Sequence, residues 1–310
     1  MKDLVTPRQV AQAIDMSESS LKRWCDQGLI PTVRTAGGHR RLPVNGVLTF
    51  LRNSGYQLVH PELLGLPPST TGGQDRKLHI EKSRLEQAFR QGDEDVGTEV
   101  VMNLYLAGIP MSAICDEVFL PIFNEIRETS DNRQEAVYLE RRACELGHRV
   151  LHEVRRAMPE LPPAALIALG GTLDGDPFTL ASSMSEMVLR ENGWRACSLG
   201  AMLPFLSLRQ AVCDMRPRLV WLNVSAIPDQ NFFLKGFDEL SRLTADSEVT
   251  LAIGGRALTP ELLSQMQFNE RYHTLHELEQ FARSLSPMMT ERNAVPTSPI
   301  DLPQLEQSET

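Results

Sequence analysis

Apolar residues recur every three or four positions in two short runs near the start of the chain. Thr6 followed by Pro7 is a typical helix start, and Ser17 followed by an acidic residue is a second one. The pattern predicts two short helices joined by a tight turn, the second of which ends at Gly28. This helix-turn-helix arrangement places the second helix in the major groove of DNA. With its apolar side turned inward, that helix leaves four polar residues outside: Ser19, Ser20, Lys22 and Arg23.

The next segment, IPTVRTAGGHRRL, predicts two short strands joined by a glycine turn, which would form a wing beside the two helices. Gly37 and Gly38 would shape its tip and let the backbone approach a phosphate group. An ordinary surface hairpin with solvated charges is the alternative. A third helix is expected from Pro43. The tip is flanked by four basic side chains: Arg34, His39, Arg40 and Arg41.

The middle of the chain changes from a turn-rich to a helical pattern. Residues 56–75 are rich in Pro, Gly, Ser and Thr, and we expect a linker there. Over residues 76–160 apolar positions lie three or four apart in four segments separated by short breaks, which predicts an antiparallel four-helix bundle.

Between residues 163 and 287 short apolar runs alternate with helical segments. The runs AALIALG, RACSLG, RLVWLNVS and VTLAIGG predict four strands of a doubly wound parallel sheet, which binds ligands at the carboxyl ends of its strands. Residues 288–310 are polar and contain proline, so we expect a disordered tail. The chain is therefore expected to be multidomain: an α winged helix-turn-helix over residues 1–55, the bundle, and an α/β domain.

Charge is distributed unevenly along the 310 residues. The first 55 residues contain eight Lys and Arg against four Asp and Glu, a balance of +4, which leaves −13 for the rest of a chain whose total is −9. A basic module on an acidic body suits a protein that binds a polyanion, because the module is attracted to DNA while the body is repelled. A merely basic, soluble domain is the alternative.

The remaining composition excludes several classes of protein. The five cysteines are scattered without a close pair, which is typical of reduced thiols in a cytoplasmic protein and of neither a disulfide framework nor a zinc site. No apolar run approaches the roughly 18 residues of a membrane span, so we expect no membrane partner.

The chain offers little catalytic or metal-binding chemistry. Glu145 and His148 form a single E-x-x-H motif, whereas bundles that hold two metal ions need it twice. A Gly-Gly-Thr run after the first predicted strand is too loose for a dinucleotide motif. No nucleophile lies in an arrangement with a base, so we expect neither a catalytic site nor a bound metal.

The first 55 residues resemble a MerR-type winged helix-turn-helix, particularly the excisionase-like branch with its GGHRR wing. The resemblance rests on the stretch TPRQVAQAIDMSESSLKRWCDQGLIPTVRTAGGHRRL. It implies a transcriptional regulator that binds double-stranded DNA through the residues named above. Because the domain is small, we expect specific affinity to require a dimer or higher homo-oligomer on paired half-sites.

Residues 76–287 resemble the cobalamin-binding module of corrinoid proteins, and the whole chain is similar to the light-sensing cobalamin-dependent repressors. Three loops carry the resemblance: GDPFTLA at 175–181, NVSAI at 223–227 and IGGRAL at 253–258. The resemblance implies a ligand pocket at the sheet edge. Its candidate residues are Asp174, Asp176, Phe178, Ser225, Gly254 and Gly255.

The resemblance fails at the positions that hold the cofactor in that family. Phe178 stands where the family has its cobalt-ligating histidine, and a phenyl ring cannot bind metal. Ala181 replaces a glycine that admits the nucleotide tail. In the helices, Ser130 and Glu140-Arg141 stand for the tryptophan and the Glu-His pair that cover the adenosyl group.

The sequence therefore predicts a sequence-specific DNA-binding transcriptional regulator whose C-terminal module serves oligomerisation or sensing. No cofactor is assigned, and cobalamin bound without a protein histidine stays open. The alternative is a switch that responds to a corrinoid or another small effector. Corrinoid-dependent methyl transfer is a third hypothesis, which predicts that the protein retains the corrinoid cofactor tightly.

Overall fold

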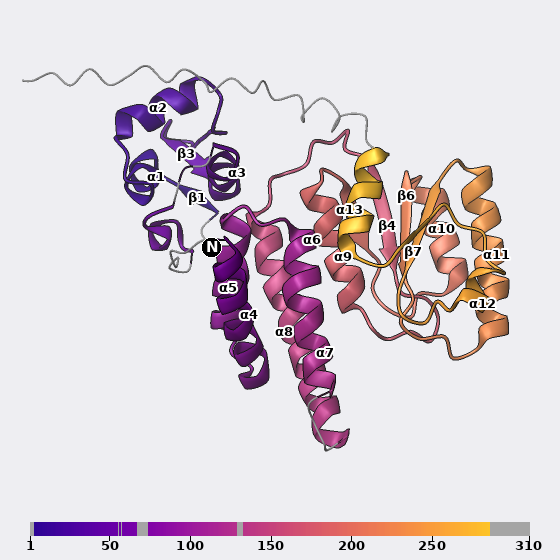
Figure 1. The fold of residues 1–310 in the computed structure, drawn as a ribbon. Coiled ribbons are helices and arrows are strands. Elements are labelled where there is room, and N and C mark those ends of the chain that lie inside the picture. The colour runs from indigo at the N-terminus through magenta and orange to yellow at the C-terminus, as the bar shows by residue number, and fades with distance from the viewer. Residues whose placement is uncertain (1–2, 55, 57, 67–73, 129–132, 286–310) are drawn as a thin grey trace, which may run out of the picture.

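The computed structural model describes residues 3–54, 56, 58–66, 74–128 and 133–285, which form three successive parts (Figure 1). The expected tail over residues 288–310 lies outside the described residues, as does the middle of the expected linker. Among the described residues, no helix combines the length and the apolar character needed to cross a membrane.

The first part contains the two predicted helices, the predicted hairpin and the third helix. Thr6 and Gln9 form a capping box at the start of α1, and the Ser17 side chain caps α2. A further short strand, Leu4–Val5, pairs with the second strand of the hairpin. It is not predicted from the sequence, because a strand of two residues has no detectable period. The elements are β1 (Leu4–Val5), α1 (Pro7–Ala13), α2 (Glu18–Asp26), β2 (Val33–Arg34), β3 (Arg40–Pro43) and α3 (Val44–Ser54), with sheet order β1-β3-β2.

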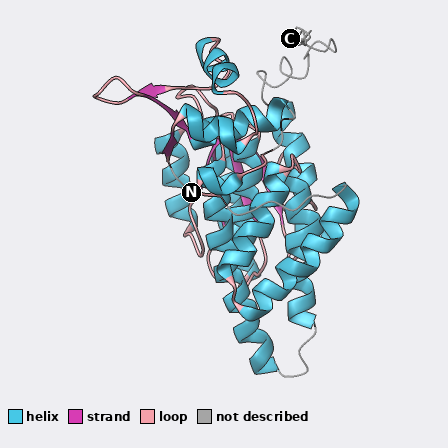
Figure 2. Cartoon of the chain, turned by 90° about the vertical axis from the view of Figure 1, so that its left-hand side faces the viewer, coloured by secondary structure: helices cyan, strands magenta, loops and turns pink. Residues whose placement is uncertain are grey.

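Apolar residues from all three helices close a small core in this part. Leu21 and Trp24 of α2 are buried as their spacing predicts, and the Trp24 ring lies 5.0 Å from the ring centroids of both Phe50 and Tyr56. The chain continues to pack here beyond residue 55, because the short 3₁₀ helix η1 (Pro61–Leu64) buries Leu64 against α1. In Figure 2 the β2–β3 hairpin projects from the helices around it.

The second part is a helical region with four successive segments, in agreement with the sequence pattern. Its third segment contains a π-helical stretch, η2, which carries Asp116. Both carboxylate oxygens of Asp116 accept backbone N–H groups, from Leu275 and His276, at the start of helix α13 (Leu275–Ser284) in the third part, each at 2.9 Å. The segments are α4 (Gln74–Gln91), α5 (Glu94–Leu106), the continuous run of α6 (Met111–Ala113), η2 (Ile114–Phe119) and α7 (Leu120–Glu128), and α8 (Arg133–Ala157).

The third part is a parallel five-stranded sheet with order β5-β4-β6-β7-β8. The sequence pattern predicts four of these strands and gives no signal for β8, because this short strand is mostly polar. The strands are β4 (Ile167–Gly171), β5 (Arg195–Ser198), β6 (Leu219–Asn223), β7 (Thr250–Gly254) and β8 (Glu270–Tyr272).

Helices cover both faces of this sheet, so it is doubly wound as predicted. One core joins α9 and α13 to Trp221 and to the helical region, and a separate core joins α10 and α11 to Val220 and Leu222. The strand order reverses between β4 and β6, the position at which α/β sheets open a crevice for ligands. The helices are α9 (Leu180–Glu191), α10 (Phe205–Met215), α11 (Gln230–Asp246), α12 (Pro260–Leu263) and α13 (Leu275–Ser284).

Candidate functional site

The outer side of α2 presents the four residues expected from the helical period. Ser19, Lys22 and Arg23 are exposed, and Ser20 is half-buried, with its hydroxyl 2.9 Å from the capping hydroxyl of Ser17. The Lys22 ammonium pairs with Glu18 one turn earlier at 2.8 Å, with both side chains largely exposed. Exposed pairs of this kind contribute little and exchange readily with other partners.

The wing forms around Gly38, whose φ of +78° is a left-handed conformation that glycine adopts without strain. Arg34 and His39 are exposed, whereas Arg40 and Arg41 are half-buried. The Arg40 guanidinium donates to Asp26 at the end of α2 at 2.7 Å. This bond holds the wing against the helix, a positioning role that the sequence analysis did not foresee.

Four other arginines of this part form no ion pair with any residue that the structure describes. They are spread over the start of α1, the exposed side of α2 and both strands of the wing. Their guanidinium groups therefore keep donors free for an external anion. The four residues are Arg8, Arg23, Arg34 and Arg41.

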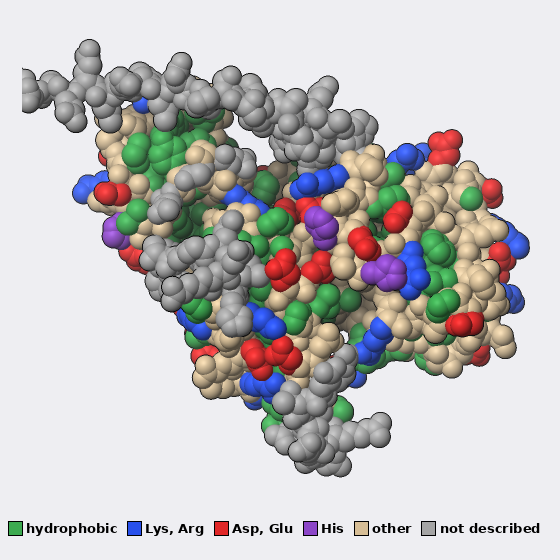
Figure 3. Space-filling model, in the orientation of Figure 1, with side chains coloured by type: hydrophobic (Ala, Val, Ile, Leu, Met, Phe, Trp, Pro, Cys, Tyr) green, Lys and Arg blue, Asp and Glu red, His purple; other side chains and the backbone are tan. Residues whose placement is uncertain are grey.

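A cavity of about 490 Å³ lies between the helical region and the carboxyl edge of the sheet. The helical region contributes the start of α7 and the middle of α8, and the other side is formed by α9 and the loops after β6, β7 and β8. In the view of Figure 3, acidic, basic and histidine side chains gather between the helical region and the third part. The cavity is lined by Leu120, Phe123, Asn124, Glu140, Cys144, Phe178, Leu180, Ala181, Met184, Asn223, Ser225, Gly255, Arg256, Leu258, Arg271, Tyr272, His273, Thr274 and Leu275.

Three of the six predicted pocket residues line this cavity: Phe178, Ser225 and Gly255. Gly254 lies beneath the Tyr272 ring, and a Cβ there would stand 2.4 Å from that ring. Asp174 lies away from the cavity and accepts the backbone N–H of Phe205 at the start of α10 at 3.1 Å.

Asp176 is buried and does not line the cavity. Its carboxylate accepts three backbone N–H groups, from Phe178 at 3.1 Å, from Ser225 at 2.5 Å and from Ala226 at 3.1 Å. These bonds tie the loop after β4 to the loop after β6. Asp176 therefore fixes the shape of the sheet edge.

Several residues that line the cavity are not among those predicted from the sequence. Arg256 stands in the quoted IGGRAL loop, where an arginine directly after the glycines was a usable signal. Arg271 and Tyr272 belong to the unpredicted strand β8. Cys144 gave no signal, and burial raises the pKa of its thiol to about 11, so it is a poor nucleophile near neutral pH.

His148 of the E-x-x-H motif lies beside α9 rather than in a cluster of ligands. Its ring nitrogens lie 2.8 Å from the Thr179 hydroxyl and 3.1 Å from the Ser183 hydroxyl. Burial lowers the pKa of this imidazole. Within the described ranges, no group of three or more His, Cys, Asp and Glu side chains gathers as metal ligands.

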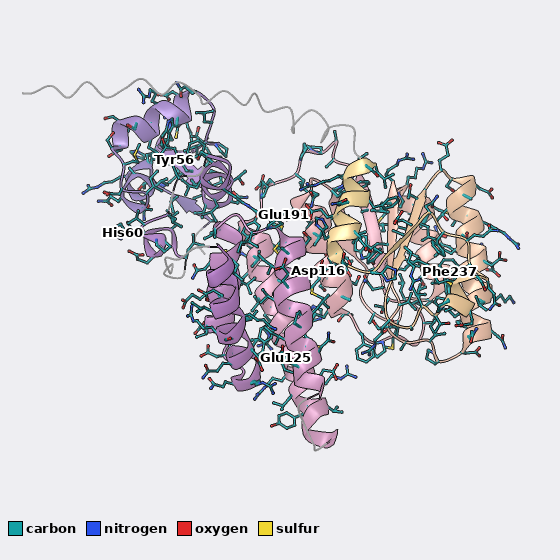
Figure 4. The ribbon with its side chains drawn as sticks, viewed as in Figure 1. Tyr56, His60, Asp116, Glu125, Glu191 and Phe237 are labelled. Carbon is teal, nitrogen blue, oxygen red and sulfur yellow. The ribbon has the colours of Figure 1, made fainter. Side chains whose placement is uncertain are left out.

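A buried contact joins the helix-turn-helix part to the other two parts. The guanidinium of Arg52, at the end of α3, lies 2.6 Å from the Glu191 carboxylate at the end of α9. It also donates to the carbonyl of Ile109 at 3.3 Å and lies 4.3 Å from the centroid of the Tyr105 ring. Glu191 in turn accepts the backbone N–H of Met111 at 2.8 Å. Figure 4 shows Glu191 where these parts meet.

Comparison with known proteins gives one family match and several structural ones. Residues 4–55 match a model described as a helix-turn-helix domain. No curated protein matches the chain. The monomethylamine corrinoid protein of Methanosarcina barkeri is 14% identical, with a TM-score of 0.53 over 67% of this chain and 99% of that one. This likeness shows a shared fold.

Two further solved structures give lower scores. A cobalamin-binding protein from Desulfitobacterium hafniense DCB-2 is 14% identical, with a TM-score of 0.36 over 67% of this chain and 99% of that one. The methanol:cobalamin methyltransferase complex of Methanosarcina barkeri is 16% identical, with a TM-score of 0.36 over 87% and 93%. The chain thus joins a helix-turn-helix domain to a helical region and a parallel α/β sheet like that of a cobalamin-binding domain.

Proposed function

We propose that this chain is a sequence-specific DNA-binding transcriptional regulator of MerR type, in which the helical and α/β parts form a sensing or oligomerisation body. The observation that carries the proposal is the capped helix α2 beside a wing, with four arginines unpaired by any described residue on the same small domain. The acidic body keeps the rest of the chain away from the phosphates. The proposal includes no enzymatic step.

The two elements would have different tasks on DNA. The exposed residues of α2, Ser19 and Arg23 among them, would contact base edges in the major groove, where an arginine reads guanine. Arg34 and Arg41 of the wing would contact phosphates, which fix the register without reading sequence. Arg40 would set the wing angle through Asp26.

The test is selection of bound duplexes from a random pool with the full chain, followed by fluorescence anisotropy on the selected site. The logarithm of the binding constant falls linearly with the logarithm of the salt concentration, with a slope of about 0.9 per phosphate contact. Arg34→Ala with Arg41→Ala should therefore reduce the magnitude of this slope by about 2 for each domain bound. Arg242→Ala, on the distant helix α11, is the matched control. An unchanged slope in the double variant, or no enrichment of any sequence, contradicts the proposal.

We further propose that the regulator binds as a dimer or higher homo-oligomer. One domain of about 50 residues offers little contact area to DNA. Two domains bound to half-sites one helical turn apart combine their contact areas. The selected sequences test this directly, since two copies of a half-site are expected in each. A single unrepeated half-site bound by monomers contradicts it.

A second candidate function is a switch controlled by a small ligand. Its support is helix α9, whose first turn lines the cavity with Leu180 and Ala181, and whose last residue, Glu191, holds Arg52 of the helix-turn-helix part. A ligand that displaces the start of α9 would move the partner of Arg52. The test is the effect of a bound ligand on DNA affinity, and no effect at saturation contradicts it.

We propose that cobalamin held by a histidine ligand is not this ligand, because the residues below the cavity do not fit it. Phe178 offers no ligand atom, and the Asp176 carboxylate is already used by three backbone donors. The buried Trp221 ring lies over Gly170, and Tyr272 lies over Gly254, so the chain's own aromatic rings fill the space beside the glycines. Gel filtration after incubation with hydroxocobalamin tests this. A co-eluting corrinoid whose absorbance spectrum shows a histidine nitrogen on cobalt contradicts it, whereas no co-eluting corrinoid, or one without that spectrum, agrees with it.

A further inference from the structure

The inner wall of the cavity is apolar on both of its sides. Leu120 and Phe123 of α7 face it from the helical region, and Leu180 and Met184 of α9 face it from the α/β part. Its volume of about 490 Å³ falls in the range of about 300 to 1,000 Å³ that is typical of sites for small molecules. The space suits a ligand with an apolar body.

The sheet side of the cavity carries two arginines that no described acidic residue neutralises. The Arg256 guanidinium lies 5.1 Å from the centroid of the Phe178 ring, and its Nε donates weakly to the Ser225 carbonyl at 3.4 Å. The Arg271 Nη2 donates to the Leu258 carbonyl at 3.4 Å. Each guanidinium has five donors, so both keep donors for a ligand.

The charge of the cavity lining is opposite to that of the chain. Among the lining residues, Glu140 on α8 is acidic, whereas Arg256 and Arg271 are basic. The chain as a whole carries −9. Cationic side chains beside an apolar cavity are stabilised when an anion pairs with them, and a guanidinium binds a planar carboxylate through two parallel hydrogen bonds.

We infer that the cavity binds an amphipathic organic anion, with its apolar body between α7 and α9 and its acidic group at Arg256 and Arg271. This inference names the class of ligand for the small-ligand switch proposed above. It rests on the proposed function only in that ligand binding would regulate DNA binding. Carboxylate and sulfonate head groups share the chemistry that the arginines recognise. Neutral molecules of the same size would lose those bonds.

The experiment uses the full chain with the fluorescent anion 1-anilinonaphthalene-8-sulfonate and with decanoate as competitor. We expect one saturable site for the probe, displaced by decanoate and far less by decanol. Arg256→Ala with Arg271→Ala should weaken decanoate binding by about tenfold or more, since charge-assisted hydrogen bonds are lost. Arg242→Ala should leave it unchanged. Ala181→Phe, which fills the cavity, should abolish the saturable site.

Equal displacement by decanol and decanoate overturns the inference, because the cavity would then select for apolar character alone. Decanoate affinity that is unchanged in the arginine variants overturns it as well. If the double variant does not fold, Arg256→Gln supplies the same comparison at a single position. DNA binding is measured on the same samples. If the full chain binds DNA but no anionic ligand, only this inference is contradicted. If it binds the anionic ligand but no DNA, only the proposed function is contradicted.

Discussion

The contact between Arg52 and Glu191 makes a sharp prediction about how the helix-turn-helix part is held. Arg52→Ala removes an ion pair at 2.6 Å whose side chains are only 19% and 13% exposed. It also removes the bond to the Ile109 carbonyl and the contact with the Tyr105 ring. The substitution leaves a buried carboxylate whose remaining described hydrogen-bond donor is the N–H of Met111.

The size of the effect follows from this burial. Breaking one side of a buried ion pair costs about 3 to 5 kcal/mol, whereas an exposed pair contributes about 0 to 1 kcal/mol. Since the pair keeps a little solvent contact, we expect Arg52→Ala to lower the free energy of unfolding by about 3 kcal/mol. Arg242→Ala breaks a pair with Asp238 at 2.7 Å whose side chains are 74% and 56% exposed. This control should change stability by less than about 0.5 kcal/mol.

The effect should also depend on pH. Burial raises the pKa of Glu191, and the Arg52 charge opposes that rise. When the pKa of a carboxyl group is higher in the folded state than its unfolded value of about 4.3, the group contributes fully to the free energy of unfolding below about pH 4.3. This contribution is lost as the pH rises through the folded-state pKa. Without Arg52 the folded pKa rises further, so the deficit of the variant should grow from pH 5 towards pH 8. Glu191→Gln in the same background should remove this growth.

The assay is urea unfolding of the full chain, followed by tryptophan fluorescence and circular dichroism at several pH values. Trp24 reports on the first part, and Trp194 and Trp221 report on the third. A loss below about 0.5 kcal/mol in Arg52→Ala, equal to that of the exposed control, would refute the reasoning. A loss that shrinks as the pH rises would refute the assignment of the pH dependence to Glu191.

Three smaller predictions concern stability and reactivity. Gly170→Ala places a Cβ 2.1 Å from the Trp221 ring, and we expect a loss of about 1 to 3 kcal/mol in urea unfolding because the buried ring must move. Thr6→Ala removes the cap of α1 and should cost about 1 kcal/mol by the same measurement, whereas no loss would show that the cap is dispensable. Since the pKa of Cys144 is raised to about 11 and Cys213 is exposed, iodoacetamide at pH 8 should modify Cys213 first by mass spectrometry, and the reverse order would contradict that.

Periodicity and turn chemistry determined most of the architecture. Helix caps at Thr6 and Ser17, the glycine hairpin and the four apolar runs depend on residues close together in the chain, so the sequence alone predicted them. The strand β8 escaped because its order comes from pairing with β7 rather than from its own pattern. Local propensity is a weak signal in so short and polar a strand.

The candidate sites divide in the same way. Exposure on α2 and in the wing follows largely from local periods, so the sequence by itself predicted the exposed side chains of Ser19, Lys22, Arg23 and Arg34. Tertiary structure alone decided that Arg40 bonds to Asp26, that Asp176 ties two loops together, and that Arg52 joins three parts of the chain. Those contacts, and the cavity between α7 and α9, join residues far apart in sequence. No local pattern encodes such contacts, because packing of the whole chain brings their partners together.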